Sequence, residues 1–210
     1  AVESALGRIT LGTRLEGRSA LMEVGGRVVP EAEIRGREVN AHVSHFAAVP
    51  AVRLRLDANG GLDLAAARAW TEFARAEPRI DFLEQPLPVG HPGYASLGPD
   101  KVALDESFLT PAGIDWAGPV VVKPALVGDW DAFRAWRATR VGPVVYSSAF
   151  ETAIGRQAAL WLAAQDPAGG AVGFDTLGRF ELDGRDRHAG GPRVRGLLDQ
   201  NWEAFWRELA

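Results

Sequence analysis

Four short apolar runs near the middle of the chain each lead into a charged residue. Asp57 follows V-R-L-R-L, Glu84 follows I-D-F-L, Asp105 follows V-A-L and Lys123 follows V-V-V. Such runs are typical of parallel β-strands that are covered on both faces. One acidic residue after a strand would mean little, but three in succession followed by a lysine predict a shared site. We expect this site to hold a divalent cation beside an amine.

Patterns typical of amphipathic helices separate the apolar runs. Asp63, Thr110 and Asp129 are predicted N-caps, and Pro111 stands at a position that favours proline at the start of a helix. The alternation of strands and helices predicts an α/β fold. The candidate strands are residues 39–43, 52–56, 80–83, 102–104, 120–122, 144–146 and 172–174.

Two α/β architectures fit this alternation, an open doubly wound sheet and a (β/α)8 barrel. No G-x-G-x-x-G follows a strand, so a dinucleotide-binding sheet has no support. Polar residues at the ends of nearly all strands favour the barrel, whose active site is built there. Residues 1–37 differ, because alternation and a Gly25-Gly26 turn predict an antiparallel hairpin or meander. We expect a partial capping region over 1–37 and a barrel domain with a C-terminal helix over 38–210.

The composition narrows the classes of function. The net charge of −4 argues against a nucleic-acid partner, and the absence of cysteine excludes disulfides and thiolate metal sites. No apolar run reaches the roughly 18 residues of a membrane span. The absence of cysteine fits a cytoplasmic protein, and we expect neither a membrane nor a nucleic acid as partner. The four histidines show no ligand spacing. Lys101 and Lys123 are the only lysines among 23 basic residues, and a lysine, unlike an arginine, can have its pKa lowered by burial.

As a set, the motifs at the strand ends resemble those of the enolase superfamily, in its muconate-lactonizing-enzyme-like subgroup. The matching motifs are L-R-L-D-A-N-G-G, F-L-E-Q-P-L, A-L-D-E-S, V-V-K-P-A and Y-S-S-A-F-E-T-A-I-G-R. The resemblance covers roughly residues 39–183, and residues 8–34 resemble part of the family's capping domain. It implies a modified (β/α)8 barrel behind a partial α+β capping domain, with the four charged residues at the ends of barrel strands three to six.

The resemblance also implies a chemistry: the magnesium-dependent dehydration of 2-succinyl-6-hydroxy-2,4-cyclohexadiene-1-carboxylate to o-succinylbenzoate, through a metal-stabilised enediolate, in menaquinone or phylloquinone biosynthesis. Its substrate is thus a small carboxylate. The implied roles are Mg2+ ligand for Asp57, Glu84 and Asp105, catalytic cation for Lys123, ligand orientation for Asn59 and Glu106, and contact with the substrate's succinyl carboxylate for Ser147 and Ser148.

Taken singly, these residues also have simpler explanations. Asp57 precedes Ala-Asn-Gly-Gly and can be a turn residue. Asp105 can cap the helix that follows it, and two serines after a strand often cap the next helix. The order and the number of the residues favour the site over these separate explanations.

The chain departs from the family at barrel strand two, which in the family carries a K-x-K pair whose second lysine removes the α-proton. Residues 39–43 match strand one and 52–56 match strand three. The eight residues from Ser44 to Ala51 are too few for a helix, a strand and a second helix, because one crossover needs about 10–12 residues. Seven strands would also leave two unpaired sheet edges. Leu21-Met22-Glu23 in place of K-x-K is disfavoured, since residues 39–43 would then have no place.

Two explanations of the missing strand stay open. The sequence either joins segments of a longer chain, as the lack of an initiator methionine and the partial capping region indicate, or belongs to a protein that truly lacks strand two. The first is favoured. The alternatives to the dehydratase are an N-succinylamino acid racemase, another enzyme of the superfamily, or a non-catalytic remnant. An epimerase is disfavoured, because F-D-T-L-G stands where dipeptide epimerases carry D-x-D. The sequence does not indicate an oligomeric state.

Overall fold

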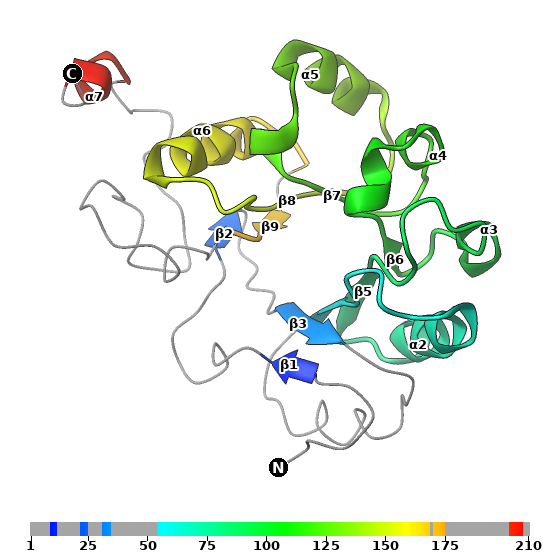
Figure 1. The fold of residues 1–210 in the computed structure, drawn as a ribbon. Coiled ribbons are helices and arrows are strands. Elements are labelled where there is room, and N and C mark those ends of the chain that lie inside the picture. The colour runs from blue at the N-terminus through cyan, green and yellow to red at the C-terminus, as the bar shows by residue number, and fades with distance from the viewer. Residues whose placement is uncertain are drawn as a thin grey trace.

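The computed structural model describes six parts of the chain, and its strands and helices alternate through the longest of them (Figure 1). The described parts are residues 9–11, 22–24, 31–34, 54–168, 170–174 and 202–207. The strand predicted over residues 39–43 lies outside them, as do His42, His45 and His188.

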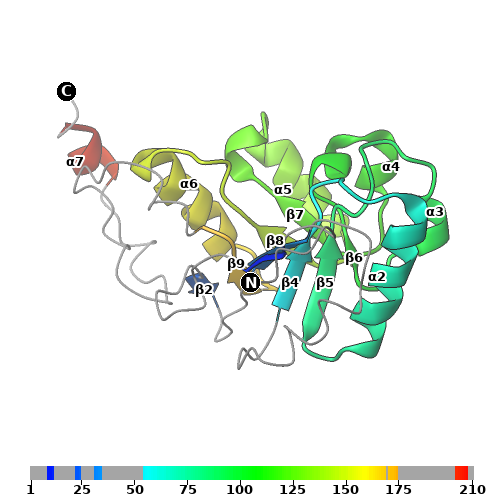
Figure 2. The ribbon, with the colours of Figure 1, turned by 60° about the horizontal axis from the view of Figure 1, so that its bottom comes forward.

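A run of parallel strands forms the centre of the molecule. The first sheet contains β1 (Ile9–Leu11), β3 (Glu31–Ile34), β4 (Leu54–Asp57), β5 (Ile80–Glu84) and β6 (Val102–Ala103), in that order. Strands β3 to β6 are parallel to their neighbours, and β1 is antiparallel to β3. Figure 2 shows β4 and β5 side by side, with α2 next to them.

The remaining strands continue this run. Strands β7 (Val120–Val122) and β8 (Val144–Tyr146) are parallel, and a parallel bridge from Leu104 to Val120 connects β7 to the end of β6. A second bridge, from Ser147 to Gly173, connects β8 to β9 (Gly170–Val172), which pairs antiparallel with β2 (Met22–Val24). The strands therefore follow a curve, with helices outside it (Figure 1).

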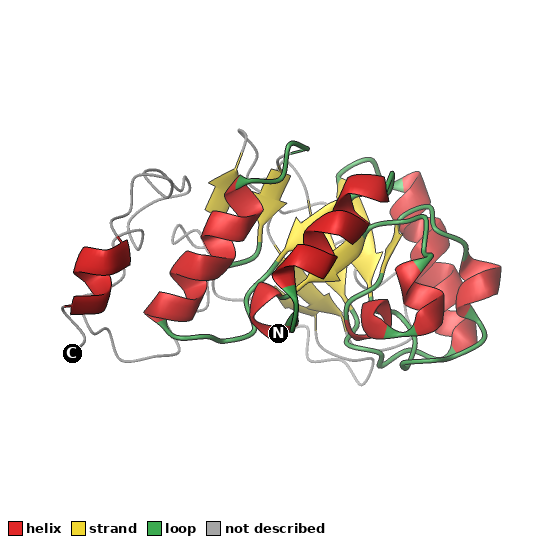
Figure 3. Ribbon diagram, turned by 90° about the horizontal axis from the view of Figure 1, so that it is seen from above, coloured by secondary structure: helices red, strands yellow, loops and turns green. Residues whose placement is uncertain are grey.

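Helices cover the outer face of this curve, and Figure 3, seen from above, shows them in front of the strands. The helices are α2 (Leu64–Ala76), α3 (Tyr94–Leu97), α4 (Pro111–Ile114), α5 (Trp130–Thr139), α6 (Ala153–Ala164) and α7 (Trp202–Arg207), with 3-10 turns η2 (Glu106–Leu109) and η3 (Pro124–Leu126). None of the helices within the described residues combines the length and apolar character that crossing a membrane requires.

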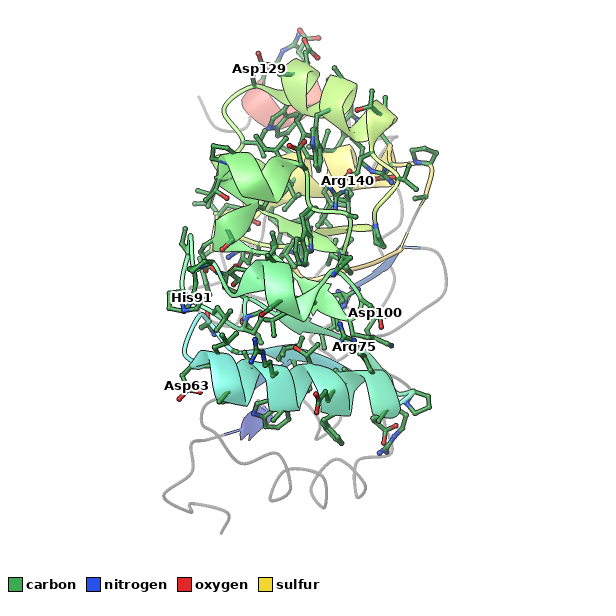
Figure 4. All side chains as sticks on the ribbon, turned by 90° about the vertical axis from the view of Figure 1, so that its right-hand side faces the viewer. Asp63, Arg75, His91, Asp100, Asp129 and Arg140 are labelled. Atoms are coloured by element: carbon green, nitrogen blue, oxygen red, sulfur yellow. The ribbon has the colours of Figure 1, made fainter. Side chains whose placement is uncertain are left out.

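The three predicted N-caps are confirmed. The side chain of Asp63 accepts from the amide of Ala66 at 2.9 Å, and those of Thr110 and Asp129 cap α4 and α5 in the same way. Each such cap stabilises a helix by about 1 kcal/mol. Asp63 and Asp129 lie towards one side of the molecule, and Arg75, Asp100 and Arg140 lie further to the other (Figure 4).

The apolar core has an outer and an inner layer. Trp70 of α2 and Leu160 of α6 are fully buried between the helices and the outer face of the strands. The inner layer is a separate cluster of one residue from each of four consecutive strands, namely Phe82, Ala103, Val121 and Val145. Because side chains alternate along a strand, the residue two positions later lies on the same face. The inner layer thus sets which side chains face inward at the strand ends.

One prediction for the N-terminal part is wrong. The hairpin around Gly25-Gly26 does not form between the two described strands that flank it, because β2 pairs with β9 while β3 pairs with β1 and β4. The strand predicted at 52–56 is described as β4, and β3 runs parallel to it on the side away from β5. Backbone hydrogen-bonding groups of β4 favour any strand that can pair with them, and residues 31–34 supply it. The predicted α/β fold with parallel strands is confirmed.

Candidate active site

The charged residues predicted to share a site lie at one edge of the parallel strands. Asp57 is the last residue of β4 and Glu84 the last of β5, and the two are paired in register. Asp105 follows the bridge residue Leu104, and Lys123 directly follows β7. The strands are parallel, so these ends meet at the same edge. This is the edge at which we expect them from the sequence.

Alternation along the strands directs several of these side chains to the inner face. Glu84, Asp105, Lys123 and Ser147 stand two positions after the four residues of the inner layer. Arg55, two positions before Asp57, is buried at 3% exposure beside the Phe82 ring, with its guanidinium carbon 5.1 Å from the ring centroid. It therefore belongs to the same inner layer, which places Asp57 on the inner face as well.

Lys123 is the electrostatic centre of this edge. Its ammonium forms an ion pair with the Asp105 carboxylate and lies 4.0 Å from Oε1 of Glu106. Burial alone would lower the pKa of Lys123, but the hydrogen bond to Asp105 and the negative charges of Asp105, Glu106 and Glu84 raise it above its ordinary value. The neighbouring carboxylates therefore favour the protonated form of Lys123.

The two carboxylates on β4 and β5 differ in environment. Glu84 is buried, at 5% exposure, whereas Asp57 is half-buried. Oδ1 of Asp57 accepts from the backbone amide of Asn59 at 2.9 Å, in a turn that gives Asn59 a φ of 46°. The Asp57 carboxylate is thus held by the turn that follows it, and Asn59 contributes its backbone amide while its side chain is exposed. The turn explanation and the site explanation of Asp57 are compatible.

The two serines after β8 contact the protein in different ways. The Ser147 hydroxyl donates to the carbonyl of Gly173 at 3.0 Å and so connects β8 with β9. The Ser148 hydroxyl donates to Oε2 of Glu151 at 3.1 Å and accepts from the amide of Phe150 at 3.0 Å. Ser148 therefore organises the loop that leads into α6, while Ser147 faces the same side as Lys123.

The carboxylates have the chemistry of a magnesium site, but their arrangement here is centred on the lysine. Mg2+ prefers hard oxygen ligands, and Asp57, Glu84 and Asp105 supply carboxylates on three consecutive strand ends. Among the described residues, no three His, Cys, Asp or Glu side chains surround one point closely enough to hold a metal ion. The structure instead brings Asp105 and Glu106 to the Lys123 ammonium. The three carboxylates are ligands of the kind that Mg2+ prefers, and the Lys123 ammonium neutralises part of their negative charge.

The two lysines of the chain lie at opposite ends of the strands. Lys101 directly precedes β6 and donates to the carbonyl of Ile80 at the start of β5, 2.5 Å away. The strand next to β4 is β3, which reads Glu-Ala-Glu-Ile, with Glu33 in register with Asp57. Lys123 is thus the one lysine of this sequence that belongs to the candidate site.

One buried polar residue at this edge was not predicted from the sequence. Gln85 directly follows Glu84, is 1% exposed, and forms side-chain hydrogen bonds to the loop that carries Asp105. A polar side chain between the end of an apolar strand and a proline was the available signal. His91, by contrast, only accepts a local hydrogen bond from the amide of Gly93 at 3.0 Å.

Comparisons with known proteins identify a consistent set of relatives. The chain is 32% identical over 174 residues to an o-succinylbenzoate synthase from Thermosynechococcus vestitus, with 76% of this chain and 51% of that protein covered. It therefore spans about half the length of this curated relative. No protein-family model matches the chain.

Solved structures lead to the same group. The crystal structure of o-succinylbenzoate synthase from Thermosynechococcus elongatus with Mg in its active site aligns with a TM-score of 0.63 at 29% identity, covering 87% of this chain and 60% of that one. An enolase-superfamily member from Roseovarius nubinhibens, in complex with magnesium, aligns with a TM-score of 0.56 at 24% identity, covering 75% and 45%. Muconate lactonizing enzyme from Pseudomonas fluorescens aligns with a TM-score of 0.55 at 20% identity, covering 70% and 44%.

Proposed function

We propose that this chain belongs to the enolase superfamily and that it carries the metal-binding and cation-bearing part of an o-succinylbenzoate synthase. The reaction would be the dehydration of 2-succinyl-6-hydroxy-2,4-cyclohexadiene-1-carboxylate to the aromatic o-succinylbenzoate, a step towards menaquinone or phylloquinone. The observation that carries the proposal is the ion pair of Lys123 with Asp105 at the strand edge that also bears Asp57 and Glu84. The relatives named above support it.

In this proposal, Asp57, Glu84 and Asp105 would hold Mg2+, with Asn59 and Glu106 orienting them. When bound, Mg2+ supplies positive charge next to the carboxylate of the substrate, which makes the neighbouring C–H bond more acidic. Three carboxylates around one dication leave a net negative charge, which the Lys123 ammonium offsets. The inward direction of these side chains and the burial of Glu84 support this assignment.

Lys123 would act in its protonated form. Its ammonium can stabilise negative charge that develops on the substrate once the α-proton has left, and no reorganisation of water is needed inside a half-buried site. The ion pair with Asp105 and the charges of Glu106 and Glu84, which raise the pKa of Lys123, support this role. Ser147 and Ser148 would lie near the succinyl carboxylate of the substrate, where a hydroxyl can donate a hydrogen bond.

The finer architecture is part of the same proposal. The curved run of parallel strands with helices outside it (Figure 1) is consistent with a (β/α)8 barrel. Residues 38–210 would form the barrel domain and residues 1–37 would belong to a capping region, except that β3 adds a parallel strand to the sheet beside β4. The enzyme would work in the cytoplasm on a small, charged substrate.

One observation favours a second candidate, a protein that binds the cation and a carboxylate without turnover. The strand beside β4 carries no lysine, and Lys101 lies at the other end of the strands. With Lys123 protonated, this sequence lacks a lysine that could remove the α-proton. The lack of such a lysine also argues against an N-succinylamino acid racemase, because proton transfer at the α-carbon also needs a base.

Turnover of the cyclohexadiene substrate, followed by the absorbance of the aromatic product, tests the proposal. We expect activity that requires Mg2+, disappears with a chelator, and falls at least 100-fold in Lys123→Met. Lys101→Met is the matched control and should keep the activity of the unsubstituted protein. Saturable binding of Mg2+ with no turnover would instead identify the binding protein, and activity indifferent to chelation would contradict both candidates.

A further inference from the structure

Gln85 connects the loops at the candidate site more extensively than its neighbours do. It is the first residue after β5, is 1% exposed, and has a φ of 38°, in the left-handed region that side chains rarely adopt. We propose that Gln85 is a positioning residue that fixes the loop carrying Asp105 and thereby sets the affinity of this edge for a divalent cation. The effect on affinity rests on the proposed magnesium site.

The side chain of Gln85 uses its full hydrogen-bonding capacity. Oε1 accepts from the backbone amides of Asp105 at 3.1 Å and Ser107 at 3.2 Å. Nε2 donates to the carbonyl of Leu87 at 2.9 Å and to the hydroxyl of Ser107 at 2.8 Å. A glutamine amide offers two acceptor sites and two donor hydrogens, so all four are occupied.

This network permits one orientation of the amide. The backbone amides of Asp105 and Ser107 can only donate, so they need Oε1, and the carbonyl of Leu87 can only accept, so it needs Nε2. A rotation of the amide by half a turn would set donors against donors in a buried place. The side chain of Gln85 is therefore fixed in one position, and so is the loop that it holds.

The backbone of Gln85 extends the restraint to the neighbouring strands. Its amide donates to the carbonyl of Ala103 in β6 at 2.9 Å, and its carbonyl accepts from the amide of Gly60 at 2.6 Å. Gly60 lies in the turn that holds the Asp57 carboxylate. One residue thus connects the loops that follow β4, β5 and β6, and these loops contain or directly follow the three proposed ligands.

Asp105 needs such a restraint. Its backbone has φ −105° and ψ −92°, outside the regular helix and strand conformations. The amide of Asp105 is held by Gln85 on one side of the residue, and its carboxylate is paired with Lys123 on the other. The direction of the carboxylate therefore depends on where Gln85 holds the backbone.

A purely structural role would predict a different result from the same substitution. A structural residue would lower the stability of the whole protein when replaced, in the way that any buried hydrogen bond does. A positioning residue would in addition change the cation affinity and the local exchange of the Asp105 loop. These two readouts separate the roles.

The test compares Gln85→Met, which keeps a similar side-chain length but forms none of the four hydrogen bonds, with Thr71→Val. The Thr71 hydroxyl donates to the carbonyl of Ala67 within α2, 2.7 Å away, so this control loses a buried hydrogen bond far from the strand ends. Ser107→Ala is the intermediate variant, because it keeps both amide hydrogen bonds to Oε1 of Gln85. Mn2+ binding is measured by electron paramagnetic resonance and hydrogen exchange over residues 104–110 by mass spectrometry.

We expect Gln85→Met to bind Mn2+ at least tenfold more weakly and to exchange faster over 104–110. Thr71→Val should lower the melting temperature with both readouts unchanged, and Ser107→Ala should stay within about threefold of the unsubstituted affinity. Equal affinity and equal exchange in Gln85→Met would overturn the inference. If the unsubstituted protein binds no Mn2+, the magnesium site and the effect of Gln85 on affinity both fail, and the exchange data alone decide whether Gln85 restrains the loop.

Discussion

Two clusters of charge lie on opposite faces of the same strands, and they are balanced differently. On the outer side, Asp166 accepts from Arg137 at 2.7 and 3.0 Å, from the Tyr146 hydroxyl at 2.8 Å and from the amide of Ala168 at 2.9 Å. On the inner side, the charges of Asp105, Glu106 and Glu84 all act on the single ammonium of Lys123. The outer cluster is neutral and saturated, whereas in the part of the chain that the structure describes the three inner carboxylates act on one ammonium.

This difference separates a structural ion pair from a binding site. A buried carboxylate whose oxygens all have partners has no capacity left for a ligand, and its removal chiefly affects folding. A group of carboxylates that outnumbers its cations is held together at an electrostatic cost, which a bound cation can relieve. We therefore expect the outer cluster to govern stability and the inner cluster to govern binding.

The largest effect on stability is expected for Asp166→Ala. The side chain of Asp166 is 3% exposed, and its loss would leave Arg137 charged in a mostly buried place. Breaking a buried pair in this way costs about 3–5 kcal/mol, and we expect the lower end because Arg137 can still reach water. Urea denaturation measures the change. A loss below about 1 kcal/mol would show that the outer cluster is not structural.

The complementary substitution is Asp105→Asn, which removes one charge from the inner cluster without changing its shape. We expect at least tenfold weaker Mg2+ binding by calorimetry, because one anionic ligand is lost, and a change in unfolding free energy within about 1 kcal/mol, because the pair with Lys123 is partly solvated. A large loss of stability together with unchanged Mg2+ binding would reverse the assignment of the two clusters.

The dependence of stability on pH should separate the clusters as well. The pKa of Asp166 is lowered because the hydrogen bonds from Arg137, the Ala168 amide and Tyr146 outweigh the opposing effect of burial. The Asp166 carboxylate therefore stabilises the fold above its unfolded pKa of about 3.9, and this contribution is lost as the pH falls through the lower folded pKa.

Lys123 acts in the opposite direction, because its folded pKa is raised. Its contribution is present below its unfolded pKa of about 10.4 and is lost as the pH rises through the folded pKa. Between about pH 2 and 4, the unfolding free energy should change less steeply with pH in Asp166→Asn than in the unsubstituted protein. In Lys123→Met this dependence on pH should stay unchanged. If the unfolding free energy of Asp166→Asn still changed as steeply with pH in this range, the pKa of Asp166 could not be the cause of that change.

The smallest effect is expected for an ion pair on the surface. Arg134 donates to Asp131 at 2.9 Å, one turn apart on α5, and the Asp131 side chain is 94% exposed. Such pairs contribute about 0.3–0.5 kcal/mol, so Asp131→Asn should change the unfolding free energy by less than about 1 kcal/mol and leave Mg2+ binding unchanged. This variant gives the baseline against which both clusters are judged.

The sequence predicted the strands and helices that lie in its central part, because short apolar runs and capping residues specify them locally. Asp63, Thr110 and Asp129 cap the helices as expected. The partners of β2 and β3 could not be predicted, since pairing between distant strands leaves no local signal in so short a stretch. The parallel pairing of β3 with β4 is the clearest example.

For the candidate site, the sequence predicted which residues share one strand edge but not how they contact each other. Order along the chain placed Asp57, Glu84, Asp105 and Lys123 together, since parallel strands end on the same side. The ion pair of Lys123 with Asp105 and the four hydrogen bonds of Gln85 depend on angles within loops, which no spacing in the sequence encodes.

The central claim is that the inner cluster binds a cation while the outer cluster stabilises the fold. Calorimetric titration of Mg2+ into the unsubstituted protein, Asp105→Asn and Asp166→Asn tests it most directly. The account predicts one saturable site per chain in the unsubstituted protein, at least tenfold weaker binding in Asp105→Asn, and undiminished binding in folded Asp166→Asn. The absence of a saturable site in the unsubstituted protein, or equal binding in the unsubstituted protein and Asp105→Asn, would contradict it.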